Sequence, residues 1–193
     1  MNKELEQVLK SGGVAVIPTD TMYGIVGSAL SKSTVERIYR VRERDPRKPL
    51  IILVNSIENL KDLGIKNIPT NILKTLWPNK ISVILPCKSK KFEYLHRGTN
   101  KLSFRIPDHA GLRALLKKTG PIVAPSANPE GKAPAKTIKE AENYFGTQVD
   151  IYVDQKKLKD VPSTIIELDT KSKISLVREG AVPFSKITHL LQN

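Results

Sequence analysis

Three hydroxyl side chains follow an apolar run near the beginning of the sequence. Thr19, Thr21 and Tyr23 alternate along a segment that starts with a proline and ends with a glycine. Open α/β sheets place ligand sites where strands end, and hydroxyl groups can hold a zwitterionic amino acid without adding net charge. We expect one side of a substrate pocket here. The alternative interpretation is a turn whose Thr and Asp side chains bond to each other.

A second segment carries a cluster of cations, Arg42, Arg44 and Lys48. Pro46 and Pro49 favour an extended backbone, which would project both arginines to the same side. Arginine forks bind phosphate oxygens in pairs and lysine adds a point charge, so the cluster suits a triphosphate. The alternative is a solvated turn whose own acidic residues pair with these cations.

Further polar residues follow two more apolar runs. Ser126 and Asn128 can hydrogen-bond a phosphate, a ribose or a base edge, with backbone N–H groups adding to the site. Ser163, Thr164 and Arg178 are weaker signals on their own, because a Ser-Thr pair at the start of a strand and an arginine before a turn are common.

Several familiar chemistries are excluded by the sequence. It has neither a Walker loop nor a Gly-x-Gly-x-x-Gly fingerprint. His96, His109 and His189 lack the spacing of metal ligands, so capping or solvated roles are expected for them. Cys87 is the only cysteine, which excludes an internal disulfide and a thiolate metal cluster. We expect it to be a small buried hydrophobic residue, and we assign no metal ligand.

Length and composition predict one globular domain over residues 1–193, with 39% hydrophobic and 26% charged residues. The net charge of +13 suits a basic cleft for phosphates, with RNA as a further candidate partner, or else a generally basic surface. No apolar run reaches the ~20 residues of a membrane span. The beginning of the chain has no secretory signal. We expect a cytoplasmic protein with no membrane partner.

Hydrophobic periodicity places these segments on a framework of interspersed helices and strands. Helices are expected at 2–10, 56–63, 70–77 and 184–191, and strands at 14–17, 50–54, 81–85, 102–106, 122–124, 149–153, 163–168 and 174–178. Ser33, Asp108 and Thr137 would cap three further helices, which run to about residues 41, 120 and 146. A long polar loop follows residue 17, and a polar stretch joins the strands on either side of 88–100. The pattern predicts an α/β fold with a mixed sheet.

Seven motifs occur in a fixed order along the chain. They are Pro-Thr-Asp-Thr-x-Tyr-Gly at 18–24, basic-x-Arg-x-x-x-Lys-Pro-Leu at 42–50, Trp-Pro at 77–78, Phe-Arg-Ile-Pro-Asp-His at 104–109, Pro-Ser-Ala-Asn at 125–128, Ser-Thr-Ile at 163–165 and Arg-Glu-Gly at 178–180. Together they closely resemble the YrdC/TsaC family, the threonylcarbamoyl-AMP synthases. The resemblance covers about residues 14 to 180 and favours the functional interpretation of the first segments over ordinary turns.

The resemblance implies a YrdC-like single domain with a twisted mixed sheet and flanking helices around a basic cavity. It also implies the reaction of L-threonine, bicarbonate and ATP to threonylcarbamoyl-AMP and pyrophosphate, the first step of tRNA threonylcarbamoyladenosine modification. ATP is then a substrate, Mg²⁺ binds through it, and a separate transferase receives the intermediate. A non-catalytic double-stranded-RNA or tRNA-binding module of the same fold, and carbamoyl-adenylation of another amine, remain alternatives.

The family's roles transfer to matching positions only. The threonine-binding residues implied are Thr19, Thr21, Tyr23, Arg105, Ser163 and Thr164, with Arg105 on the substrate carboxylate. The implied phosphate clamp and catalytic group is Arg42, Arg44 and Lys48, with Ser126, Asn128 and Arg178 as further ATP contacts.

The sequence departs from the family in three places. Arg42 stands where the family usually has lysine, so charge persists but reach differs. The stretch after Trp77-Pro78 lacks the usual Gly-Pro, and the segment 155–161 lacks the glycines that often precede Ser-Thr. Because the sequence ends shortly after Arg-Glu-Gly at 178–180, we expect it to resemble the short, single-domain form of the family.

Overall fold

The computed structural model describes residues 3–155 and 161–192 of the chain. Its helices are α1 (Lys3–Lys10), α2 (Lys32–Val41), α3 (Asn59–Asp62), α4 (Thr70–Leu76), α5 (Glu93–His96), α6 (Ala110–Thr119), α7 (Ile138–Phe145) and α8 (Phe184–Leu190), with 3₁₀ turns η1 (Lys90–Phe92) and η2 (Gly146–Gln148). Its strands are β1 (Val14–Pro18), β2 (Tyr23–Ser28), β3 (Ile51–Leu53), β4 (Ile81–Pro86), β5 (Lys101–Arg105), β6 (Ile122–Val123), β7 (Ile151–Tyr152), β8 (Thr164–Leu168) and β9 (Ile174–Arg178). No helix among the described residues has the length and apolar character needed to span a bilayer.

Within these residues the strands form one sheet in the order β7-β1-β2-β6-β3-β5-β4-β8-β9. The pairs β1–β7, β3–β5 and β4–β8 are parallel, and the other neighbouring pairs are antiparallel. The mixed α/β sheet predicted from the sequence is confirmed.

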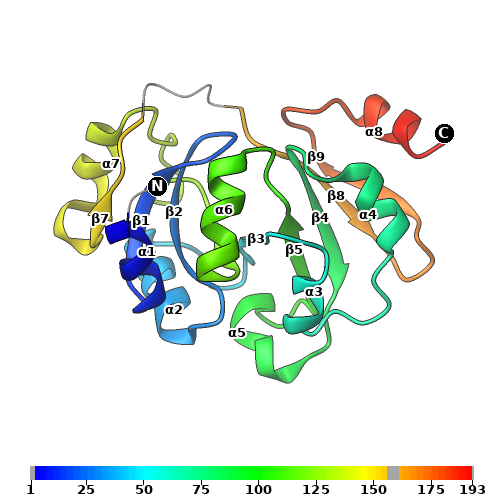
Figure 1. The fold of residues 1–193 in the computed structure, drawn as a ribbon, viewed down its shortest axis with the longest axis horizontal. Coiled ribbons are helices and arrows are strands. Elements are labelled where there is room, and N and C mark those ends of the chain that lie inside the picture. The colour runs from blue at the N-terminus through cyan, green and yellow to red at the C-terminus, as the bar shows by residue number, and fades with distance from the viewer. Residues whose placement is uncertain (1–2, 156–160, 193) are drawn as a thin grey trace.

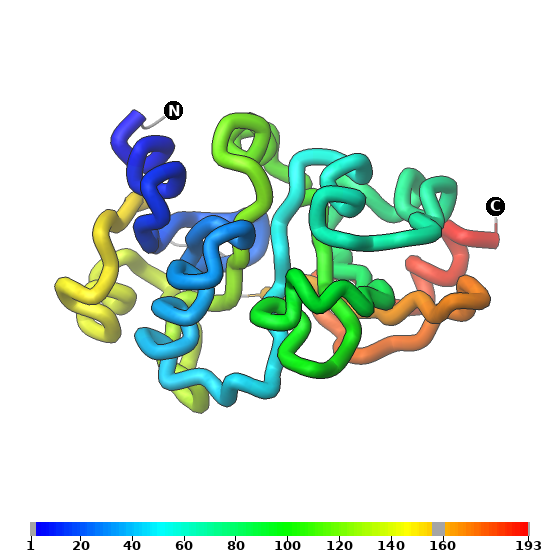
Figure 2. The backbone as a smooth tube through the Cα atoms, turned by 90° about the horizontal axis from the view of Figure 1, so that it is seen from below, coloured from blue at the N-terminus to red at the C-terminus, as the bar shows by residue number. Residues whose placement is uncertain are grey.

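Helices cover both faces of the sheet, as the alternation along β1 requires. Ala15 and Ile17 belong to an apolar cluster that includes α1 and α6, whereas Val14 and Val16 belong to a second cluster that includes Ile38 of α2. Figure 1 shows α6 in front of the centre of the sheet. Figure 2, turned by 90°, shows α1 and α6 on one side of the sheet and α2 on the other.

The long polar loop expected after residue 17 is wrong beyond residue 22. Residues 23–28 form β2, which pairs antiparallel with β1 from Pro18 opposite Tyr23. Residues 19–22 are the hairpin turn, closed by a hydrogen bond from the Thr19 N–H to the Met22 carbonyl at 3.1 Å. The first polar segment is therefore a tight turn that joins the end of β1 to the start of β2.

One of the three predicted helix caps is confirmed, and two are displaced. The Thr137 hydroxyl caps α7 as expected. Ser31 rather than Ser33 caps α2, and the ring of His109 rather than Asp108 caps α6, each accepting from the N–H three residues further on. The capping role expected for His109 is thus confirmed, although Asp108 was expected to cap this particular helix.

The polar stretch 88–100 is also more ordered than expected, because it folds into η1 and α5. Cys87, just before it, is 1% exposed, and its Sγ approaches the Leu63 carbonyl at 3.6 Å. Its predicted role as a buried apolar residue is confirmed. Burial raises the pKa of its thiol, which disfavours a thiolate.

Candidate functional site

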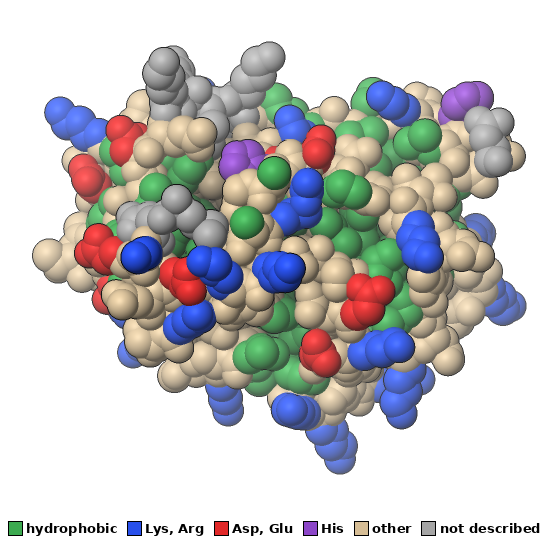
Figure 3. All heavy atoms as spheres, in the orientation of Figure 1, with side chains coloured by type: hydrophobic (Ala, Val, Ile, Leu, Met, Phe, Trp, Pro, Cys, Tyr) green, Lys and Arg blue, Asp and Glu red, His purple; other side chains and the backbone are tan. Residues whose placement is uncertain are grey.

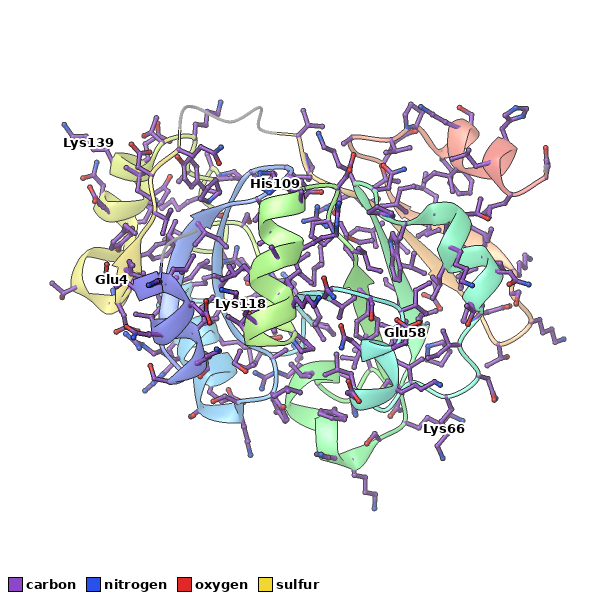
Figure 4. The ribbon with its side chains drawn as sticks, viewed as in Figure 1. Glu4, Glu58, Lys66, His109, Lys118 and Lys139 are labelled. Carbon is purple, nitrogen blue, oxygen red and sulfur yellow. The ribbon has the colours of Figure 1, made fainter. Side chains whose placement is uncertain are left out.

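Seven separate segments of the sequence line one cavity of about 350 Å³, here called the central cavity. The predicted site residues that line it are Thr19, Thr21, Arg105, Ser126, Ser163 and Arg178. The hairpin turn after β1, the end of β5, the segment after β6 and the region where β8 and β9 meet contribute them. In Figure 4 the labelled His109 marks the end of α6 closest to this part of the molecule. The structure thus brings six of the predicted residues together.

Asp20 and Arg105 form a buried ion pair at this cavity, although they are 85 positions apart in the sequence. Their side chains are 2% and 4% exposed. The Arg105 Nη1 donates to Asp20 Oδ1, and the Asp108 N–H donates to Asp20 Oδ2 at 3.1 Å. The Nε of Arg105 is buried and has no hydrogen-bond partner within the described part of the chain. Asp20 therefore fixes the guanidinium but leaves part of it unsatisfied.

A second network fixes Ser163 at the opposite wall. Its hydroxyl lies 2.9 Å from the Ser82 hydroxyl, and its carbonyl accepts from Arg178 Nη2 at 2.8 Å. Gly180 packs against this segment so closely that an added Cβ would lie 2.7 Å from the carbonyl carbon of Ser163. The last motif, Arg-Glu-Gly, thus keeps residues 162–163 in place.

The central cavity has a positive electrostatic character. Water exclusion lowers the pKa of Arg178, and the nearby charge of Arg105 lowers it further. Burial also lowers the pKa of Arg105, and Asp20 opposes that effect. Asp20 balances the charge of Arg105, so the charge of Arg178 gives the cavity its net positive character and favours an anionic ligand. The basic cavity expected from the sequence is therefore present.

Arg42 lies behind the cavity wall. It is 2% exposed, and it donates from Nε to the Asn128 carbonyl at 2.9 Å and from Nη2 to the Ser126 hydroxyl at 3.3 Å. Its Nη1 is buried and has no hydrogen-bond partner among the described residues. Burial first, and Arg44 second, lower its pKa to about 10. The side-chain Nδ2 of Asn128 donates hydrogen bonds to the Pro129 and Lys132 carbonyls.

The rest of the predicted phosphate clamp does not line the central cavity. Arg44 donates to the Lys48 and Pro49 carbonyls, and Lys48 forms an ion pair with Glu130 at 2.5 Å. The expected extended backbone is wrong here, because Glu43 has φ 51° and the Lys48 N–H closes a turn onto Asp45 at 3.1 Å. Arg42 and Arg44 consequently have different partners instead of projecting together.

Two of the predicted threonine-binding residues have structural partners instead. The Tyr23 hydroxyl contacts Asp154 Oδ1 at 3.0 Å and the backbone of Gln155. The Thr164 hydroxyl bonds to the Val182 carbonyl and accepts from the Gly180 N–H at 3.0 Å. The departure noted at 155–161 falls mostly on residues 156–160, which lie outside the described residues.

Three residues at the site were not assigned from the sequence. Asp20 is part of the first motif, but a pairing with Arg105 leaves no local signal. Ser82 is a buried polar residue on a buried strand, and that pattern could have indicated a hydrogen-bonded role. Glu130 is the second residue after the Pro-Ser-Ala-Asn motif, and its backbone N–H donates to the Arg42 carbonyl at 2.7 Å.

The acidic groups of the site are already engaged. Among the described residues no cluster of three or more His, Cys, Asp or Glu side chains could hold a metal ion. The Asp20 carboxylate is bound to Arg105 and to the Asp108 N–H.

The fold and the site define an α/β protein with a deep, cationic cavity suited to a small anionic or zwitterionic ligand. The chain belongs to the Sua5/YciO/YrdC family, described as "Telomere recombination", whose model matches residues 7–180. The resemblance seen in the motifs is therefore confirmed.

Relatives of known name match almost the whole chain. A threonylcarbamoyl-AMP synthase of Pyrococcus abyssi is 31% identical over 95% of this chain and 55% of its own length. A protein of Methanocaldococcus jannaschii named putative threonylcarbamoyl-AMP synthase is 29% identical, over 95% of this chain and 87% of its own length. The chain thus spans little more than half of the first relative.

Solved structures confirm the fold. The structure of P. abyssi Sua5 complexed with L-threonine superposes with a TM-score of 0.88 at 29% identity, covering 98% of this chain and 56% of that one. Escherichia coli YciO superposes with a TM-score of 0.81 at 24% identity, which shows the shared fold alone.

Proposed function

We propose that this protein is a threonylcarbamoyl-AMP synthase, which converts L-threonine, bicarbonate and ATP to threonylcarbamoyl-AMP and pyrophosphate. The observation that carries the proposal is the central cavity, where the Thr19 and Thr21 hydroxyls lie with Arg105 in one lining. The names of the relatives and the threonine complex of P. abyssi Sua5 support it.

The threonine side of the cavity is the hairpin turn. Thr19 and Thr21 are each 7% exposed, and their hydroxyl oxygens lie 3.1 Å apart. The Thr19 hydroxyl donates to the Met22 carbonyl at 2.7 Å within the turn, so the Thr21 oxygen is the acceptor that the pair offers to a ligand. Arg105 lines the same cavity, and its guanidinium, held by Asp20, suits a substrate carboxylate. Tyr23 and Thr164 support the walls, and Ser163 contacts the substrate from the opposite side.

The ATP side is formed by Ser126, Arg178 and the buried Arg42. The buried Nη1 of Arg42 has no hydrogen-bond partner among the described residues, and there the hydrogen bonds of Arg178 go to the Ser163 carbonyl and hydroxyl. Asn128 orients Arg42. Arg44 and Lys48 complete the clamp after Lys48 leaves Glu130, so ATP binding includes a rearrangement of the segment 42–48.

The chemistry asks the protein for alignment and charge neutralisation. The threonine amine adds to bicarbonate with loss of water, and a carbamate oxygen then attacks the α-phosphorus while the bond to the pyrophosphate oxygen breaks. Both reactants are anionic, so Arg42, Arg105 and Arg178 offset their repulsion and hold them in line. Mg²⁺ would come with ATP and neutralise phosphate charge, with no protein carboxylate as ligand.

The wider setting follows from the reaction. The mixed anhydride is hydrolysed readily in water, so a separate transferase must receive it, and tRNA is the final acceptor. We also infer that residues 1–193 act as one domain, since a single sheet runs through the described residues.

The test is pyrophosphate release from ATP by the purified chain. We expect release that requires both L-threonine and bicarbonate, with L-serine and glycine as poorer substrates. Thr21→Ala should raise the KM for threonine about 3- to 10-fold, the loss of one hydrogen bond, and leave the KM for ATP within twofold. Release that ignores threonine would remove the proposal.

The second candidate is a non-catalytic RNA-binding module. The net charge of +13 favours an RNA-binding module. On the face of the molecule drawn in Figure 3, however, lysine and arginine side chains are scattered among acidic ones and do not form one stripe. An RNA binder also has no need for a cavity lined by two threonines and an arginine. Binding of tRNA without threonine-dependent pyrophosphate release would favour this alternative.

A further inference from the structure

A second cavity lies away from the central cavity. Its volume is about 420 Å³, larger than the central one, and the segments 64–69, 85–89 and 169–172 line it. These segments connect α3 to α4, end β4 and join β8 to β9. None of the residues assigned to the proposed synthase site lines it.

The topology places this cavity at a favourable position for a ligand. Strands β4 and β8 are parallel neighbours, paired from Ile81 opposite Thr164 to Ile84 opposite Glu167. The central cavity lies at their amino ends, beside Ser163, and the second cavity at their carboxyl ends. Ligand sites in α/β sheets form outside the carboxyl ends of parallel strands. At ~3.3 Å per residue, the two cavities are separated by about 20 Å.

The walls of the second cavity are held by specific contacts. Gly64 has φ 78°, and an added Cβ there would lie 2.9 Å from the Ser89 Cβ, so the two backbone segments are closely packed. In the turn on the other wall, Asp169 Oδ1 accepts the Lys171 and Lys173 N–H groups at 2.8 Å each. The cavity is therefore built into the fold.

The lining combines an apolar surface with a net positive charge. Ile65 and Leu85 are 5% and 2% exposed and contribute the apolar part. Lys66 and Lys88 also line the cavity, and neither has an ion-pair partner among the described residues. Figure 4 shows Lys66 on the connection between α3 and α4, at the edge of the molecule.

Asp169 is the one carboxylate among the described residues of the lining, and with the two lysines it leaves a net charge of +1 (+2 − 1). One oxygen of Asp169 is engaged by the two backbone N–H groups of its own turn. Two lysines on an apolar surface favour a ligand with an anionic end and an apolar body.

We propose that this lysine-rimmed cavity is a second binding site, for a small organic anion with a carboxylate or phosphate head and an apolar body. The proposal is independent of the proposed synthase activity, because it uses none of the residues of the central cavity.

The test is fluorescence titration of the full chain with 8-anilinonaphthalene-1-sulfonate, an apolar anion, in the presence of ATP and L-threonine. We compare the wild type with the double variant Lys66→Glu/Lys88→Glu and with Lys61→Glu/Lys74→Glu. The control pair is exposed, lies outside the lining, and changes the net charge equally. We expect saturable binding that weakens at least tenfold in the cavity variant and less than twofold in the control. Equal affinities in all three proteins, equal losses in both variants, or no saturable binding would overturn the proposal.

Displacement then distinguishes the two head groups. Hexanoate and hexyl phosphate carry the same apolar body, and displacement by one of them identifies the preferred anion. Raising NaCl from 50 to 500 mM should weaken dye binding to the wild type several-fold and leave the cavity variant nearly unchanged. Displacement by neither compound would mean that the dye only adsorbs, and would refute the site.

Discussion

The buried pair between Asp20 and Arg105 makes the sharpest stability prediction. Because these side chains are 2% and 4% exposed, Asp20→Ala leaves a guanidinium buried without its counterion. Removing one partner of a buried ion pair costs about 3–5 kcal/mol. For a chain of this size, about 2–4 °C is lost per kcal/mol, so the melting temperature should fall by roughly 6–20 °C.

Urea denaturation followed by circular dichroism measures this loss directly. Asp20→Asn keeps an acceptor for Arg105 and should cost less than Asp20→Ala. Lys118→Ala is the control, since it removes an exposed partner of Glu6 and should change the stability by less than about 1 kcal/mol. A loss below about 1 kcal/mol for Asp20→Ala would refute the claim that Asp20 compensates a buried charge.

Three further predictions concern the supporting residues. Glu130→Gln should lower the KM for ATP about 2- to 5-fold in the pyrophosphate assay, because Lys48 no longer has to leave a carboxylate. The Lys48 contact holds the pKa of Glu130 below its ordinary 4.5, so the stability it adds is present above that pH and is lost as the pH falls through the lowered pKa. Gly180→Ala should destabilise the fold by about 1–3 kcal/mol in urea titration, since the Cβ meets the backbone of Ser163. Burial raises the pKa of Tyr152 to about 12, so a phenol signal that titrates near that pH in alkaline absorbance should disappear in Tyr152→Phe.

Local signals predicted most helices and most strands, but they missed η1, α5 and β2, where tertiary packing decides. β2 was missed because Gly24 and Gly27 interrupt its apolar pattern. Gly27 is needed for close packing on α2, since a Cβ there would lie 3.1 Å from the Ile38 side chain. Ser31 and Ser33 are equally good caps by composition. Only the backbone conformation in the structure, which is extended at Ser31 and helical from Lys32, identifies Ser31 as the cap.

The candidate site was predicted as a set of segments but not as a set of contacts. Motif order placed Thr21, Arg105 and Ser163 at one site, and they do line one cavity. The pairing of Lys48 with Glu130 could not be seen, because it depends on two loops 82 positions apart meeting at the back of the cavity wall. Ser82 was overlooked because a single serine in an apolar strand has no motif around it.

The distribution of charge across the central cavity matches the two substrates of the proposed reaction. At the Thr19 end, Arg105 is neutralised by Asp20, so that wall carries little net charge and suits a zwitterion held by hydroxyl groups. At the other end, Arg178 has only carbonyl and hydroxyl acceptors of Ser163 among the described residues, and its pKa is lowered by Arg105. That wall retains its positive charge and favours phosphate. A single counterion, Asp20, would then direct the amino acid and the nucleotide to opposite sides of one basic cavity.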